Sequence, residues 1–202
     1  MKSKWNDYKQ LRKLTKIDYL KELTESKKPY IIYKSNKGFD LYTDFSKKII
    51  LTNNNIKSFI NKATQFKFKK KETDIFIGFF GYEILNNLIG VKIKKQKGLK
   101  FPKGIFYKPE TKVKLQKKLD YKNLELIKSN KPFKVNINKP SYKVIFDKFK
   151  KKIKSGETYQ IKICTKYSNT AQIDALDFFC RLVKTNMAPE AFMIKDKNYS
   201  II

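Results

Sequence analysis

Histidine is absent from the 202 residues, and arginine and cysteine each occur only twice, at Arg12, Arg181, Cys164 and Cys180. The absence of histidine excludes Ser–His and Cys–His nucleophiles, histidine-ligated metals and imidazole acid–base chemistry. The two cysteines form neither a disulfide framework nor a metal-binding motif. Any chemistry must therefore use carboxylates, lysines or groups supplied by another chain.

Long hydrophobic runs are also missing. No apolar run reaches the ~18 residues that a membrane span requires. The best candidate, residues 75–90 (IFIGFFGYEILNNLIG), is interrupted by Glu83, Asn86 and Asn87. The first residues, MKSKWNDYKQLRK, contain no apolar segment of the signal-peptide type. We therefore expect a cytoplasmic protein that has no membrane partner.

Charge is strongly one-sided, with 47 Lys and Arg residues against 18 Asp and Glu residues and a formal net charge of +29. A surface selected to bind phosphates and bases is expected to use Arg, because its planar fork pairs bidentately with both. Here nearly all basic residues are Lys, and they are scattered along the whole chain. This pattern favours the compositional drift of an AT-rich genome over specific nucleic-acid binding, although weak polyanion binding at low salt is expected.

Hydrophobic periodicity predicts an α+β protein whose first part combines helices with short antiparallel strands. A hydrophobic share of 41% and an aromatic share of 14% are typical of a globular chain. In residues 74–90, an apolar strand precedes a short helix, and Gly78 and Gly81 indicate either close backbone approach or positive φ. The other expected elements are strands at 29–35, 38–44, 47–52 and 99–115, a helix at 7–26, and a helix capped by the Asn run 53–55.

The last third has a clearer pattern. A helix is predicted with Ser141 as its N-cap and with Gly156 just beyond its end. A strand is predicted over 158–167, then a helix from Asp174 and a hairpin over 191–202. The helix before Gly156 is expected to have one apolar face, formed by Tyr142, Ile145, Phe146, Phe149 and Ile153.

Four blocks, taken in order, resemble the chorismate-utilising enzymes. They are PYIIYKSNKGFD (29–40), GFFGYEILNNL (78–88), GETYQIKICTKY (156–167) and TNMAPEAFMI (185–194). This family includes component I of anthranilate synthase and of aminodeoxychorismate synthase. The resemblance implies antiparallel sheets packed as a sandwich with helices outside. It also implies that Tyr159 and Tyr167 are buried in the central sheet rather than forming a base-stacking platform.

The resemblance implies two domains. Residues 1–140 correspond to the N-terminal domain of component I, with a connector at about 116–140, and residues 141–202 to the incomplete start of the chorismate-binding domain. In the family, the chorismate pocket and the magnesium-binding glutamates follow the hairpin at 191–202. No catalytic residue and no metal ligand is therefore assigned, and the sheet is expected to be truncated. A fragment, half of a split gene and a non-catalytic pseudo-subunit all remain open. Apolar surface that the complete enzyme covers is expected at Ile161, Ile163, Phe192 and Ile194.

Two features favour the aminodeoxychorismate branch, which aminates chorismate to 4-amino-4-deoxychorismate in folate (p-aminobenzoate) biosynthesis. Ala188 precedes the proline where anthranilate synthases usually read N-P-S-P-Y-M-F, and GFDLYTD (38–44) resembles the S-R-F-D segment of aminodeoxychorismate synthases. Anthranilate synthase of tryptophan biosynthesis is the alternative, and a basic nucleic-acid-binding protein is a further one. The resemblance implies Mg²⁺ in the complete enzyme and a glutamine amidotransferase, component II, as the partner that supplies ammonia.

One ligand site is implied by the resemblance, a tryptophan-type pocket. A Ser hydroxyl and backbone groups would hold the ammonium and carboxylate of the ligand, while apolar residues hold the indole. Alternatively, these are turn and core residues without a ligand, with Ser35 capping a turn. One wall would consist of Ser35, Gly38, Phe39 and Asp40, and the other of Pro189, Glu190 and Ala191.

Overall fold

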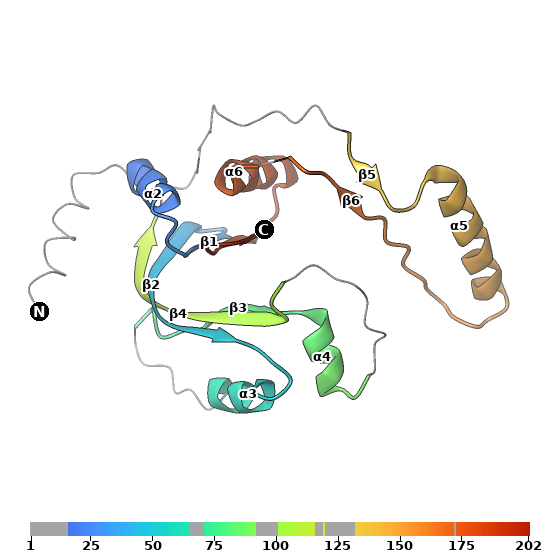
Figure 1. Ribbon diagram of the computed structural model, residues 1–202, viewed down its shortest axis with the longest axis horizontal. Coiled ribbons are helices and arrows are strands. Elements are labelled where there is room, and N and C mark those ends of the chain that lie inside the picture. Colours follow the sequence, from blue (N-terminus) through green and yellow to red (C-terminus); the bar gives the residue numbers. More distant parts are fainter. Residues whose placement is uncertain (1–15, 65–70, 92–100, 116–118, 120–131, 172) are drawn as a thin grey trace, which may run out of the picture. The chain divides into compact units, whose positions relative to one another are not determined.

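The structure is a computed structural model that describes residues 16–64, 71–91, 101–115, 119, 132–171 and 173–202 (Figure 1). Its contacts group the chain into two compact units, residues 1–122 together with 175–202, and residues 123–174. The predicted helix at 7–26 is confirmed as α2 (Lys16–Glu25), and its first part lies outside the described residues. The domain boundary at residue 140 stays a prediction.

The first unit is built on a six-stranded antiparallel sheet, in the order β3-β4-β2-β1-β7-β8. Strand β1 pairs with β2 on one side and with β7 on the other. The predicted α+β class, with antiparallel strands and helices, is confirmed. The strands are β1 (Tyr30–Ser35), β2 (Gly38–Ile50), β3 (Ile77–Phe80), β4 (Gly104–Lys114), β7 (Ala191–Lys195) and β8 (Ser200–Ile201).

The prediction of two separate strands at 38–44 and 47–52 is wrong, because both belong to the single strand β2. The interruption is a register shift between Phe45 and Lys47, where Asp44 adopts a positive φ of 52°. Both sides of this β-bulge pair with the same neighbour, β4. The polar residues therefore mark a bulge that bends a long strand, not a turn between two strands.

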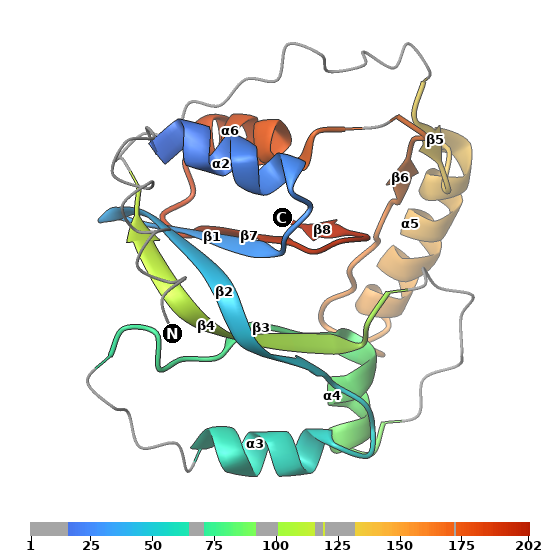
Figure 2. The same ribbon diagram turned by 60° about the vertical axis from the view of Figure 1, so that its left-hand side comes forward.

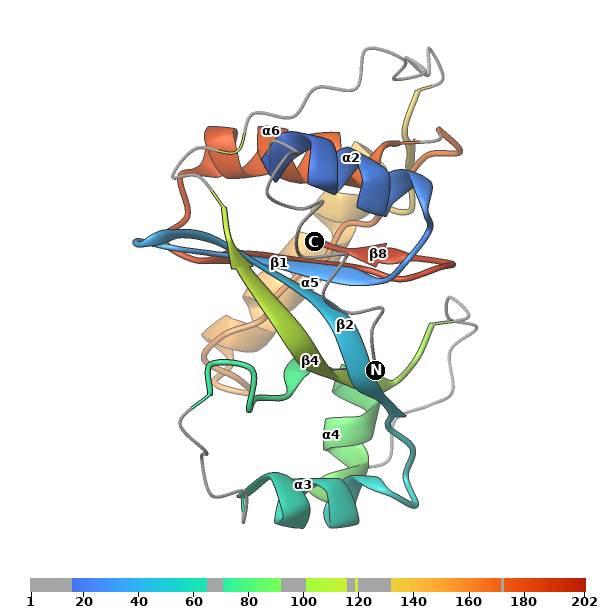
Figure 3. The ribbon, with the colours of Figure 1, turned by 90° about the vertical axis from the view of Figure 1, so that its left-hand side faces the viewer.

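Two helices cover one face of the sheet. Helix α2 and helix α6 (Ala175–Asn186) lie side by side above β1 and β7 (Figure 3). Leu20 of α2 and Phe179 of α6 are fully buried in a core that includes Ile32 of β1 and Met193 of β7. The last part of the chain therefore packs into the same core as the first helix.

A second pair of helices lies at the other end of this unit (Figure 2). Helix α3 (Ile56–Thr64) and helix α4 (Tyr82–Leu88) share a small core. Phe59 of α3 and Ile84 of α4 are among its buried residues, and Phe106 of β4 packs against it. The predicted helix after the Asn run and the strand–helix element at 74–90 are thus confirmed.

Gly78 and Gly81 meet the neighbouring backbone, as the sequence indicated. A Cβ atom on Gly78 would lie 1.9 Å from the Ile105 carbonyl oxygen, and one on Gly81 would lie 2.3 Å from the Lys103 carbonyl oxygen. No side chain can be added at either position without moving strand β4. The close-approach alternative is therefore correct for both glycines.

The second unit contains helix α5 (Lys139–Lys154) and a two-stranded sheet of β5 (Lys134–Val135) and β6 (Tyr167–Ser168). Its helix cap differs from the prediction. Asn138, not Ser141, is the N-cap, because its side-chain oxygen accepts the Ser141 amide at 2.9 Å while Pro140 occupies the first turn. Gly156 ends the helix with a φ of 76°, as predicted.

The predicted strand at 158–167 is wrong over most of its length. Only its last residue, Tyr167, lies in a strand, in β6. A strand persists only where a neighbour offers backbone partners, and β5 reaches no further than Val135 in the part of the chain that the structure describes. Tyr159 is 92% exposed and Tyr167 is 64% exposed, so the prediction that both are buried is also wrong.

The apolar surface expected at four residues is only partly observed. Ile161 and Ile163 are half-buried, and Phe192 is 41% exposed, as expected. Ile194 is instead buried, because it pairs with Ile31 on one side and Ile201 on the other. Helix α5 has the predicted apolar face, but none of its side chains is buried. None of the helices in the described ranges is both long and apolar enough to cross a bilayer.

Replacing Gly78 tests the close contact between β3 and β4. We expect Gly78→Ala to lower the free energy of unfolding by about 2 kcal/mol or more, because overpacking against rigid backbone costs roughly 1–3 kcal/mol. Gly104→Ala is the milder comparison, since a Cβ there would lie 3.0 Å from the flexible Leu51 side chain and 3.1 Å from the Phe79 carbonyl oxygen. Urea unfolding of both variants measures the difference. Equal midpoints would contradict the contact.

Candidate functional site

The predicted ligand site begins at the tight turn between β1 and β2. Ser35 pairs with Gly38 across this turn, and the Ser35 hydroxyl oxygen accepts the Lys37 amide at 3.2 Å. Gly38 has a φ of 117°, which a residue with a side chain rarely adopts. Ser35 therefore has a structural role as a turn cap, which was the alternative interpretation of this residue.

The second predicted wall, at residues 189–191, lies directly beside this turn. Ala191 pairs with Lys34 in the β1–β7 ladder. The Lys34 ammonium donates to the Ala188 carbonyl oxygen at 2.5 Å and to the Pro189 carbonyl oxygen at 3.4 Å. The structure therefore brings together the two segments that the sequence placed in one site, although they are about 150 residues apart.

The predicted wall residues are divided between the two faces of the sheet. Phe39 is buried under α6, with its ring centroid 6.4 Å from that of Phe179, and Ala191 packs against the same core. Asp40 follows Phe39 in β2, and successive side chains of a strand point to opposite faces. Asp40 and its partner Tyr33 therefore lie on the face opposite Phe39. The site residues are thus neighbours along one sheet margin, with apolar groups on one face and polar groups on the other.

Polar groups on that opposite face interact with one another. Asp40 forms an ion pair with Lys112 at 3.2 Å, and Lys112 forms a second one with Glu72, also at 3.2 Å. Desolvation raises the pKa of Tyr33, and a hydrogen bond with Glu190 raises it further. Glu190, from the second wall, therefore lies near the Tyr33 hydroxyl of β1.

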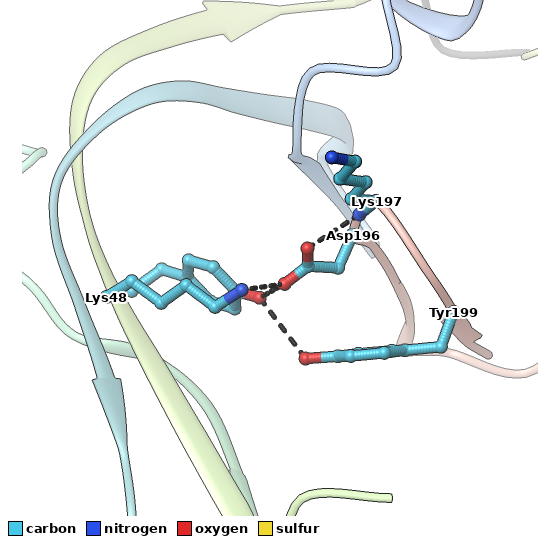
Figure 4. A network of polar contacts seen from close by, with 5 residues as sticks. Lys48, Asp196, Lys197 and Tyr199 are labelled. Carbon is cyan, nitrogen blue, oxygen red and sulfur yellow. Dashed lines mark hydrogen bonds and ion pairs between the residues drawn. The ribbon is translucent and has the colours of Figure 1, made fainter.

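A second polar cluster, which the sequence analysis missed, surrounds Asp196 in the β7–β8 turn (Figure 4). Asp196 is only 6% exposed. One carboxylate oxygen accepts the Lys48 ammonium at 2.6 Å and the Tyr107 hydroxyl, and the other accepts the Lys197 amide at 2.6 Å. The Tyr199 hydroxyl lies 3.4 Å from that of Tyr107. The cluster connects the β7–β8 hairpin to strands β2 and β4.

These contacts determine the charge state of Asp196. Burial acts to raise its pKa, but hydrogen bonds from Lys48 and Tyr107 and from the Lys197 amide hold the pKa below its ordinary value. Burial and the hydrogen bond to Asp196 raise the pKa of Tyr107 well above its usual range. The carboxylate is therefore charged and the phenol neutral at neutral pH.

No local sequence pattern could have revealed this cluster. Asp196 and Lys48 are 148 positions apart, and Asp196 and Tyr107 are 89 positions apart. The one local signal is Asp at the start of the turn DKNY, a common turn residue. Asp196 also closes that turn through its own backbone, because its amide donates to the Tyr199 carbonyl at 2.9 Å.

Comparison with protein families identifies the family of this chain. The sequence matches the family described as chorismate binding enzyme over residues 18–202, which includes nearly all of both units. The chain belongs to this family. Comparison with curated proteins gives no significant match. The family assignment therefore confirms the chorismate-utilising resemblance, whereas the branch of the family is not decided by it.

Magnesium, expected for the complete chorismate enzyme, does not fit the carboxylates described here. Within the ranges that the structure describes, no three His, Cys, Asp or Glu side chains form a group that could hold a metal ion. The best-buried carboxylates already have cationic partners. Asp196 is paired with Lys48, and Asp177 of α6 with Arg181 at 2.9 Å. These acids therefore have structural roles.

Asp196 makes the stability of this chorismate-family chain depend on pH. Its pKa is lower in the folded than in the unfolded state, so its contribution is complete above about pH 4, its unfolded pKa, and is lost as pH falls through the folded pKa. We expect Asp196→Asn to lower the free energy of unfolding at pH 7 by about 1.5–3 kcal/mol and to flatten its decline below pH 4.

The control for this prediction is Glu110→Gln, at an exposed position on β4, the strand that carries Tyr107. Urea titrations between pH 3 and pH 7 compare the three proteins. An Asp196→Asn variant with the wild-type dependence on pH would show that Asp196 does not stabilise the hairpin.

Proposed function

We propose that the chain is the N-terminal part of component I of aminodeoxychorismate synthase. The complete enzyme aminates chorismate to 4-amino-4-deoxychorismate on the route to p-aminobenzoate and folate. The observation that carries the enzyme class is the family match over residues 18–202. Ala188 before Pro189 and the GFDLYTD segment support the branch. Anthranilate synthase component I is the second candidate, because the two enzymes share the motifs and differ in the carbon that is aminated.

The proposed reaction also requires a metal ion and a source of ammonia. We assign neither to the described residues. We propose that Mg²⁺ is bound by glutamates outside these 202 residues and that a glutamine amidotransferase, component II, supplies ammonia. We place the enzyme in the cytoplasm. In this scheme the described residues build the sheet that supports the chorismate site, and none is a catalytic residue.

The proposal includes a tryptophan-type pocket at the margin where β1 meets residues 188–191. Its support is the proximity of the Ser35 turn to residues 189–191, which the hydrogen bonds of Lys34 to the Ala188 and Pro189 carbonyl groups hold beside β1. L-Tryptophan would then raise the unfolding temperature of the chain by mass action. Ser35→Ala should reduce this shift, whereas Ser46→Ala in β2 should leave it unchanged. No shift at millimolar L-tryptophan would exclude the pocket.

Complementation tests the branch. A complete component I coding sequence that begins with these residues and includes the catalytic half, expressed with a component II, is introduced into one bacterial strain that lacks component I of aminodeoxychorismate synthase and one that lacks component I of anthranilate synthase. We expect growth without p-aminobenzoate in the first strain and no growth without tryptophan in the second. The reverse pattern would assign the chain to anthranilate synthase, and growth in neither strain would contradict both assignments.

Purified residues 1–202 test the placement of the catalytic groups. With chorismate, ammonia and Mg²⁺, we expect no aminated product above a buffer control, as measured by chromatography. Turnover by this polypeptide would mean that catalytic groups lie within residues 1–202 and would contradict the proposal.

A further inference from the structure

Residues 72–91 are the longest stretch of the sequence without Lys or Arg. All 47 such residues lie in the other 182 positions, about one in four, as expected where solvated positions drift towards Lys codons. A stretch of this length that escaped the drift is expected to be buried. Much of it is exposed instead, so burial within this chain does not explain its composition.

The exposed part is an apolar face on helix α4 and the residues that flank it. Tyr82 is 78% exposed, Leu85 is 40% exposed and Ile89 is 73% exposed. Their spacing of three and four residues places them on one side of the helix. Ile84 is fully buried in the core shared with α3. Helix α4 is therefore apolar on the side facing the core and also on the side facing solvent.

The strand that precedes this helix is an edge of the sheet. Strand β3 pairs with β4 on one side, and its other side has no neighbouring strand in the described part of the chain (Figure 2). Edge strands are commonly protected from pairing by Lys, Pro or bulges. β3 has the sequence IGFF, contains none of these, and ends in Phe80, which is 39% exposed.

The distribution of lysines bears on which protein covers the exposed face of β3 and α4. Two copies of a chain with a net charge of +29 repel each other wherever their lysines meet. Residues 72–91 carry no Lys or Arg and three acids, Glu72, Asp74 and Glu83. When two copies meet through this segment, no lysine of the segment faces a lysine of the same segment in the other copy. The apolar side chains of the two copies contact each other instead. A two-fold axis would also place the two β3 edges antiparallel, as an isologous contact requires.

We propose that the β3 edge and the exposed face of α4 form the interface of a homodimer. The contact consists of Phe80, Tyr82, Leu85, Ile89 and Val91 of each copy. It does not depend on the catalytic assignment. Because apolar burial holds the dimer together while the net charge opposes it, salt should strengthen the association by screening the repulsion. An acidic partner protein would show the opposite dependence on salt.

Sedimentation equilibrium of the purified 202-residue chain tests this proposal at 50 mM and 500 mM NaCl. We expect a dimer whose dissociation constant falls at least tenfold at the higher salt. Leu85→Lys and Ile89→Lys should each raise the dissociation constant at least tenfold. Tyr82→Ser, at a position that is 78% exposed, tests the same face without adding charge.

The matched control is Val144→Lys, which adds the same charge at a 70% exposed apolar position on α5. It should leave the dissociation constant of the dimer within about twofold of wild type. Circular dichroism confirms that each variant is folded. A monomer at both salt concentrations would overturn the proposal. So would a dimer that is weakened by salt, or one that is equally affected by Leu85→Lys and Val144→Lys.

Discussion

The first unit depends on the double pairing of strand β1. Its backbone is hydrogen-bonded to β2 on one side and to β7 on the other, and its neighbouring residues Ile31 and Ile32 are both fully buried, one on each face. A strand that is buried on both faces and paired on both edges cannot be shifted by one residue without moving every side chain to the wrong face. β1 thus fixes the register of strands that come from opposite ends of the chain, and helices α2 and α6 are brought together above it.

The two polar clusters follow from the same register. Lys34 reaches the carbonyl groups of residues 188 and 189 because β7 pairs with β1. The Asp196 carboxylate reaches Lys48 and Tyr107 because the β7–β8 hairpin and Tyr107 of β4 pack into the same core, which includes Ile194. Contacts of charged groups thus hold the chain at both ends of β7, where the apolar core ends. A carboxylate buried among three donors is costly to leave unpaired, so these contacts favour one arrangement of the hairpin over others.

The sequence predicted most elements of this unit, because hydrophobic period, glycines and proline act locally. β1, α3, the β3–α4 element and α6 were all found in this way. The β2 bulge was missed because polar residues around Asp44 are equally typical of a turn. The strand expected at 158–167 was wrong because alternation shows only that a strand suits a buried place, and no local signal shows whether a partner strand is present. For the same reason the Asp196 cluster could not be predicted, since its members come from the β7–β8 turn and from the distant strands β2 and β4.

Hydrogen exchange of the whole chain, followed by mass spectrometry, tests the central role of β1 most directly. If β1 joins both ends of the chain in one cooperative unit, amides in β1, β2 and β7 exchange slowly and with the same free energy of opening. Residues 158–166, which lie outside any described strand, should exchange much faster. Exchange of β7 as fast as that of residues 158–166, with β1 and β2 still protected, would contradict the account. It would mean that β7 is not held by β1.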